Sequence, residues 1–169
     1  MKKYIFTLFL FFHFIYCTAQ SDQNPNSCLD TIKTTSIQWA NLGIGAVSDF
    51  NNYRGINFGL SYHWKLKSLT YKTGISHSAK LSGMAINDLN FGLGKSIVHR
   101  FYVFCLAAGP GIVWGKEFNS SISLVGQFEI VFTPIKNLGF GVELFSNINN
   151  ANNLFGSRII IHLNDKKYN

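Results

Sequence analysis

Apolar and polar residues alternate without interruption along residues 56–67. One set of alternate positions carries Ile56, Phe58, Leu60, Tyr62, Trp64 and Leu66, and the other carries Asn57, Gly59, Ser61, His63, Lys65 and Lys67. Successive side chains of a β-strand point to opposite faces, so this alternation predicts a strand with one apolar and one polar face. Large aromatic residues on one face, with charged residues on the other, are typical of a strand that is exposed to lipid.

The same alternation recurs along the chain and predicts eight strands, separated by turns that contain Gly, Asn, Pro and Ser. The predicted strands are residues 36–47, 56–66, 69–77, 86–94, 100–114, 121–132, 138–145 and 155–163. In the first strand, the apolar residues change parity between Trp39 and Leu42, which predicts a β-bulge near Asn41.

The spacing of the strands also predicts how two hairpins pair. A two-residue turn at Lys67 and Ser68 places Trp64 opposite Tyr71, so that both lie on the apolar face. In the last hairpin, the same arithmetic places Glu143 opposite Arg158 on the polar face. Agreement of face in the first hairpin, and of charge in the last, supports the predicted strands.

These strands predict an all-β fold, an eight-stranded antiparallel up-and-down transmembrane β-barrel. Side chains just fill the interior of a barrel of eight strands, so we expect no open pore. With both termini in the periplasm, turns at 67–68, 96–99 and 133–137 face the cell, and loops at 48–55, 78–85, 115–120 and 146–154 face outward.

The N-terminus has the layout of a secretory signal peptide. Lys2 and Lys3 precede an apolar stretch at 5–16, and small residues at 17–20 provide a cleavage region. The alternative is a lipoprotein signal with Cys17 as the lipidated residue, although the bulky Tyr16 precedes it. We therefore divide the chain into a signal peptide at 1–20, a polar periplasmic leader at 21–34, the barrel at 35–164 and a polar tail at 165–169.

Composition agrees with a membrane location. Charged residues make up only 14% of the chain and aromatic residues 15%, and the formal charge is +7. A basic surface suits outer-membrane lipid and lipopolysaccharide as partners, whereas the export signal and the lack of a basic cluster argue against nucleic acid. Cys28 and Cys105 remain after cleavage, and we expect two isolated thiols because one lies in the leader and the other inside a strand.

Six ionisable residues carry the inward parity: Glu129, Glu143, Arg158, Lys65, Lys72 and His63. One interpretation is a path for protons or ions. The interpretation we favour is a structural network of charges that fills a closed lumen, because buried charges need partners. We expect Arg158 to be shared between Glu143 and Glu129.

No spacing in the sequence indicates a catalytic, cofactor or metal site, and we expect none of these. The chain has no CxxC motif for zinc and no nucleophile elbow around a serine. Residues 143–149 faintly resemble the active-site stretch of outer-membrane lipid A 3-O-deacylases. Ser146 and Asn147 match that stretch, but Leu144 stands where those enzymes carry the histidine that activates the serine, so the resemblance implies no activity here.

A resemblance of wider extent covers most of the mature chain. Residues 138–149, followed by Phe155, Gly156 and a terminal strand, resemble the last hairpin of small outer-membrane β-barrel proteins of the Bacteroidetes type, as does the signal ending in Ala19 and Gln20. These families are similar in architecture to the OmpA and OmpX transmembrane barrels. Those families mostly lack an assigned activity. For this chain we expect a monomer, inserted by the barrel assembly machinery, with a structural, adhesive or ligand-contacting role. Such barrels often end on an aromatic residue, whereas the last strand here ends near Leu163.

Two other functions stay open at this point. The first is a lipid-modifying outer-membrane enzyme, which requires a histidine beside Ser146. The second is a secreted, lipocalin-like carrier, which requires the apolar face of the strands to point inward.

Overall fold

A computed structural model describes residues 37–49, 54–80, 85–116, 118–135, 137–150 and 153–164. The predicted signal peptide, leader and polar tail, together with Cys28, lie outside these residues. Within the described ranges, no helix is long and apolar enough to cross a membrane.

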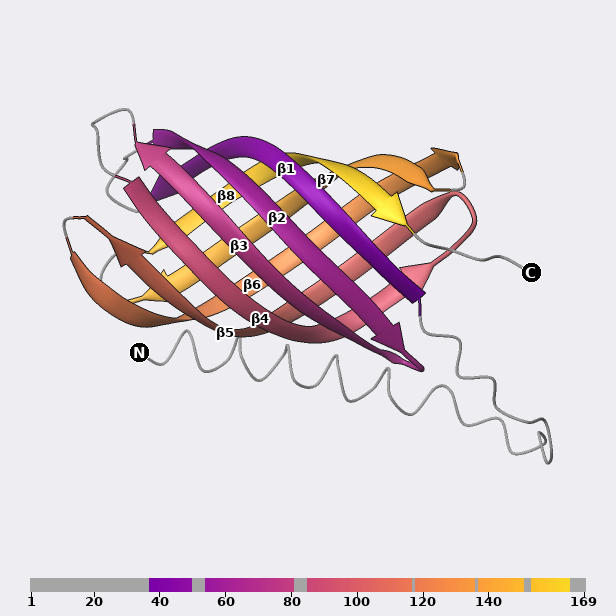
Figure 1. The fold of residues 1–169 in the computed structure, drawn as a ribbon, viewed down its shortest axis with the longest axis horizontal. Coiled ribbons are helices and arrows are strands. Elements are labelled where there is room, and N and C mark those ends of the chain that lie inside the picture. The colour runs from indigo at the N-terminus through magenta and orange to yellow at the C-terminus, as the bar shows by residue number, and fades with distance from the viewer. Residues whose placement is uncertain are drawn as a thin grey trace. The chain divides into compact units, whose positions relative to one another are not determined.

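Eight strands form a closed antiparallel barrel in which each strand pairs with the next and β8 pairs with β1 (Figure 1). The strands are β1 (Ile37–Asp49), β2 (Arg54–Leu66), β3 (Leu69–Lys80), β4 (Ala85–Val98), β5 (Tyr102–Gly115), β6 (Phe118–Ile135), β7 (Leu138–Asn149) and β8 (Leu154–Asn164). The predicted fold class, an eight-stranded up-and-down barrel, is confirmed.

Several strands extend beyond their predicted ends. β4 continues to Val98, through part of the turn predicted at 96–99, and β7 continues to Asn149, inside the loop predicted at 146–154. Polar residues at the rim of a barrel interrupt the apolar alternation without interrupting the backbone hydrogen bonds. For this reason the sequence pattern underestimates the length of the strands.

The bulge predicted near Asn41 is wrong. β1 pairs in continuous register with both β2 and β8. The apolar parity changes because Trp39 points into the lumen, where it is 2% exposed, while Leu42 and Ile44 point outward. A large apolar side chain inside the barrel therefore produced a pattern that resembles a bulge.

Both predicted hairpin registers are confirmed. Trp64 lies opposite Tyr71 across the turn at Lys67 and Ser68, and Glu143 lies opposite Arg158. Lys67 has a φ of 54°, a conformation that L-residues other than Asn and Asp seldom adopt. The tight turn between β2 and β3 thus places a lysine in a backbone conformation that lysine does not favour.

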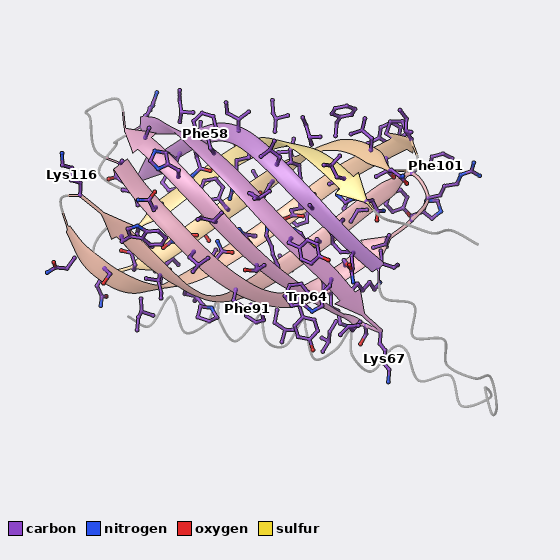
Figure 2. All side chains as sticks on the ribbon, viewed as in Figure 1. Phe58, Trp64, Lys67, Phe91, Phe101 and Lys116 are labelled. Atoms are coloured by element: carbon purple, nitrogen blue, oxygen red, sulfur yellow. The ribbon has the colours of Figure 1, made fainter. Side chains whose placement is uncertain are left out.

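The exterior of the barrel is apolar and its interior is mixed. Outward side chains on every strand are large and exposed, among them Leu42, Phe58, Ile75, Phe91, Ile112, Ile130, Val142 and Ile159. They project away from the barrel wall around the strands (Figure 2). An exterior of this kind is stable against lipid rather than water.

Two apolar clusters fill opposite ends of the lumen. Near the start of β1 and the end of β8 lie Trp39, Val103, Cys105, Val131 and Ile160, which we call the first apolar cluster. Near the end of β1 and the start of β8 lie Val47, Ile86, Val113, Phe145 and Leu154, the second apolar cluster. Polar and charged side chains occupy the lumen between them.

Candidate functional site

The candidate site is the group of buried charges between the two apolar clusters. Lys72 of β3 is at its centre and is 0% exposed. Its ammonium group donates to Glu129 Oε1, in an ion pair, and to Glu143 Oε1 at 2.9 Å. Glu129 of β6 and Glu143 of β7 are register partners, so the one lysine neutralises two carboxylates that stand side by side.

A shell of polar side chains surrounds these carboxylates. Asn41 Nδ2 donates to Glu129 Oε2 at 2.9 Å, and Asn41 Oδ1 lies 2.8 Å from Nδ1 of His162. His63 Nε2 lies 3.4 Å from Glu129 Oε1 and 3.0 Å from Ser61 Oγ. The indole ring of Trp39 stacks on the imidazole of His63 at a centroid distance of 4.9 Å, so the first apolar cluster directly covers this shell.

Arg158 of β8 contacts the neighbouring strand β7 and lies over β2. Its Nη2 lies 3.4 Å from Glu143 Oε1, and its Cζ lies 4.4 Å above the ring of Phe145, a cation–π contact. A Cβ atom on Gly59 of β2 would lie 1.5 Å from Arg158 Nη1, so the guanidinium lies directly over this glycine. The absence of a side chain at Gly59 makes room for the arginine.

A second polar group lies closer to the other end of the lumen. Asp88 accepts hydrogen bonds from Asn147 and, at 2.6 Å, from Nδ2 of Asn90. Asn149 Nδ2 in turn donates to Asn147 Oδ1 at 2.9 Å. Sequence reasoning did not include these residues, although inward parity of Asp88 and Asn90 was a signal that could have found them.

Five of the six predicted lumen residues meet in one group of contacts. Lys72, Glu129, Glu143 and His63 form one cluster, and Arg158 joins it through Glu143. Lys65 instead donates to the backbone carbonyl of Ser96 at 2.8 Å. The expectation that Arg158 is shared with Glu129 is wrong, because the cation that contacts Glu129 is Lys72. Asn41 and His162 were missed, because inward parity alone does not show which polar side chains of a strand reach the carboxylates.

Solved structures of small outer-membrane proteins share this architecture. The barrel is similar to Neisserial surface protein A (TM-score 0.55, 8% identity, covering 76% of this chain and 95% of that chain). It is also similar to the N-terminal β-barrel domain of Pseudomonas aeruginosa OprF (TM-score 0.57, 8% identity, covering 76% of this chain and 96% of that chain). A further similar structure is Ail, the attachment invasion locus protein of Yersinia pestis (TM-score 0.50, 12% identity, covering 76% of this chain and 96% of that chain). No protein-family model and no curated protein matches the sequence.

The chain has the fold of small outer-membrane β-barrels. At such low sequence identities, the likeness concerns the fold and not the chemistry of the lumen. The charged cluster must therefore be interpreted from its own geometry.

The position of Ser146 does not suit a deacylase. Ser146 shares the outward parity of Leu144 and Ile148 on β7, whereas His63 and His162 point into the lumen. His77 belongs to β3, four strands away around the barrel from β7. His99 lies in the turn between β4 and β5, neither of which pairs with β7. No histidine among the described residues therefore lies beside Ser146.

The apolar face of the strands points outward and the polar face points inward, which contradicts a lipocalin-like carrier. Such a carrier needs an apolar interior, but this lumen contains Lys72, Glu129, Glu143 and Arg158, all buried. Leu60, Phe91 and Ile159, at the apolar parity, are exposed on the outside.

Folding brings together one set of residues with metal-ligand chemistry. His63 of β2, Cys105 of β5 and Glu129 of β6 are all buried, and one potential ligand atom from each lies within 4.8 Å of the others. The sequence did not indicate this group, because its members are separated by 42 and 24 residues and share no motif.

Proposed function

We propose that this protein is a small integral β-barrel of the Gram-negative outer membrane with a structural role in the cell envelope and no catalytic activity. The observation that carries the proposal is the continuous apolar exterior of a closed barrel. Burying such a surface in lipid is favourable, whereas in water it would drive aggregation.

Aromatic residues at one end of the barrel support a membrane orientation. Trp64 stacks on Tyr71 at a centroid distance of 5.6 Å and lies 6.2 Å from the ring of Phe91. Lys67 and Phe101 belong to the turns at this same end, whereas Lys116 lies at the opposite end (Figure 2). Aromatic rings next to basic residues are typical of a membrane–water interface, here the one we assign to the periplasmic side.

The filled lumen supports a structural role rather than transport. Two apolar clusters and the buried ion pairs of Lys72 lie in series along the lumen. In this proposal the charged network contributes to the barrel's conformational specificity, with lipid, lipopolysaccharide and the barrel assembly machinery as partners of a monomer. The resemblance of the last hairpin and of the signal ending supports a protein of the Bacteroidetes type.

An adhesive role is the second candidate. The observation that favours it is the structural likeness to a protein whose name describes attachment and invasion. Outward loops that join the strands would carry such a contact.

Membrane insertion is tested by fractionation and by gel mobility. The exported protein is expected to stay in the membrane pellet after a urea wash, and in detergent to migrate faster unheated than boiled. A product that is soluble without detergent would contradict the proposal.

Two arginine substitutions at different depths sharpen this test. Leu60 lies at the middle of β2 and Leu66 at its end, and both side chains are exposed on the outside. In a bilayer, Leu60→Arg is expected to cost about 2–4 kcal/mol and Leu66→Arg about 0–1 kcal/mol. Equal costs in lipid vesicles would mean that the exterior does not span a bilayer.

A further inference from the structure

We propose that the lumen binds one transition-metal ion of the zinc class between His63, Cys105 and Glu129. The three side chains come from β2, β5 and β6 and are 0%, 2% and 1% exposed. The closed barrel thus positions an imidazole, a thiol and a carboxylate around one point without any contribution from a loop.

The chemistry of the three side chains selects the metal. Zinc binds cysteine sulfur, histidine nitrogen and carboxylate oxygen, commonly through three protein ligands and one further ligand. Calcium and magnesium prefer all-oxygen sites and would not favour the thiol. His63 Nε2 and Glu129 Oε1 are 3.4 Å apart, a separation compatible with two ligands of one ion at metal–ligand distances of about 2.0–2.2 Å.

The surrounding side chains support ligands in these positions. Asn41 holds the second oxygen of Glu129 at 2.9 Å. Ser61 Oγ lies 3.0 Å from His63 Nε2, the nitrogen that faces the carboxylate, so a metal–nitrogen bond replaces this contact. Trp39 fixes the plane of the imidazole by stacking. His63 Nδ1 is buried and has no hydrogen-bond partner, so the histidine is not fully satisfied by the side chains around it. Neighbours that orient ligands in this way increase the affinity of a metal site.

Metal binding changes the charge balance of the lumen. The cation replaces the proton of the Cys105 thiol, forming a metal–sulfur bond and releasing one proton to solvent. Lys72 competes for Glu129, but it also donates to Glu143 at 2.9 Å and can keep that carboxylate as its partner. No oxidant or reductant takes part in this exchange.

Cobalt(II) is the probe, because a cobalt–thiolate bond gives a charge-transfer absorption band. The protein carries Cys28→Ser, so that Cys105 is the only cysteine after the predicted signal peptide, and is refolded in detergent with cobalt because the site is enclosed. We expect one equivalent of bound cobalt and a charge-transfer band. Cys105→Ala is expected to abolish the band, and His63→Gln is expected to weaken cobalt binding at least about tenfold.

His77→Gln is the matched control, because His77 is an exposed histidine on β3 whose Nδ1 lies 2.8 Å from Asn87 Oδ1, outside the cluster. It should leave the band and the cobalt affinity unchanged. Heat-dependent gel mobility establishes that each variant is folded.

X-ray absorption of the zinc-loaded Cys28→Ser protein provides a test that needs no ligand variant. We expect one sulfur neighbour at about 2.3 Å and nitrogen or oxygen neighbours at about 2.0–2.2 Å. The proposal is overturned if the folded protein binds no cobalt, if the charge-transfer band survives in Cys105→Ala, or if zinc has no sulfur neighbour. Any of these results leaves the barrel fold and its membrane location intact.

Discussion

At the scale of single residues, Lys72 is the centre of the lumen. Two carboxylates in direct register would repel each other strongly in a space shielded from water, and the ammonium group between them removes that repulsion. The sequence indicated that these charges face inward, but it did not indicate that one lysine would serve both.

Replacing Lys72 is therefore expected to be more damaging than replacing another inward lysine. Lys72→Met leaves Glu129 and Glu143 without their shared cation and is expected to cost about 3–5 kcal/mol in urea unfolding in detergent. Lys65→Met is the control, because Lys65 is only partly buried and lies near the end of β2, and it should cost less. Adding Glu129→Gln to Lys72→Met should recover part of the loss, and failure to recover any would mean that the carboxylates do not repel each other.

A second prediction concerns the glycine beneath Arg158. Gly59→Ala places a methyl group where Arg158 Nη1 lies and is expected to cost about 1–3 kcal/mol. Gly92→Ala is the control, because the nearest atom to its new Cβ is 3.4 Å away. The cost of Gly59→Ala should nearly vanish in an Arg158→Ala background, as a double-mutant cycle would measure. Additive costs would show that the arginine does not lie over this glycine.

At the scale of elements, the alternation of apolar and polar residues predicts which face each side chain of a strand takes. The length of the turn predicts the register of a hairpin. Alternation predicted the outward and inward faces of β2, β3, β4, β6, β7 and β8 because the period of a strand is two residues. It failed in β1, where Trp39 is apolar and inward. Alternation reports the face of a side chain only when the two faces differ in polarity.

The β2–β3 hairpin can be stabilised at its turn. Lys67→Gly relieves an unfavourable positive φ and is expected to stabilise the barrel by about 0.5–1 kcal/mol after the entropic cost of glycine. Ser68→Gly is the matched control, because Ser68 does not share the positive φ, and it should give no gain. The measurement is equilibrium unfolding in urea, and a loss of stability for Lys67→Gly would contradict the strain at this turn.

At the scale of the whole molecule, closure of the barrel creates both the lipid-facing surface and the enclosed lumen. The two apolar clusters lie at opposite ends of the polar interior, so that an ion would have to pass both of them. The interior of a barrel of eight strands is in general just wide enough for side chains to fill.

We therefore expect no large, stable channels in planar-bilayer recordings. Trp39→Ala removes the largest side chain of the first apolar cluster but leaves the second cluster in place, so it should not open a channel either. Reproducible large openings in the unmodified protein would mean that the lumen is wider than its packing indicates.

The sequence by itself determined the number of strands, the face of most side chains and the register of two hairpins. Each of these follows from local rules, namely the two-residue period of a strand and the length of a tight turn. It also placed Glu143 opposite Arg158, because β7 and β8 are neighbours in the chain.

Only the tertiary structure decided which inward residues meet. Lys72 reaches Glu129 and Glu143 over separations of 57 and 71 residues, and Asn41 meets Glu129 over 88. Parity states that a side chain faces the lumen but not at what depth or toward which wall. Depth and direction depend on the tilt and stagger of strands in the closed barrel, which no local pattern encodes. The grouping of His63, Cys105 and Glu129 has the same origin, because three strands must close around the lumen before these ligands lie together.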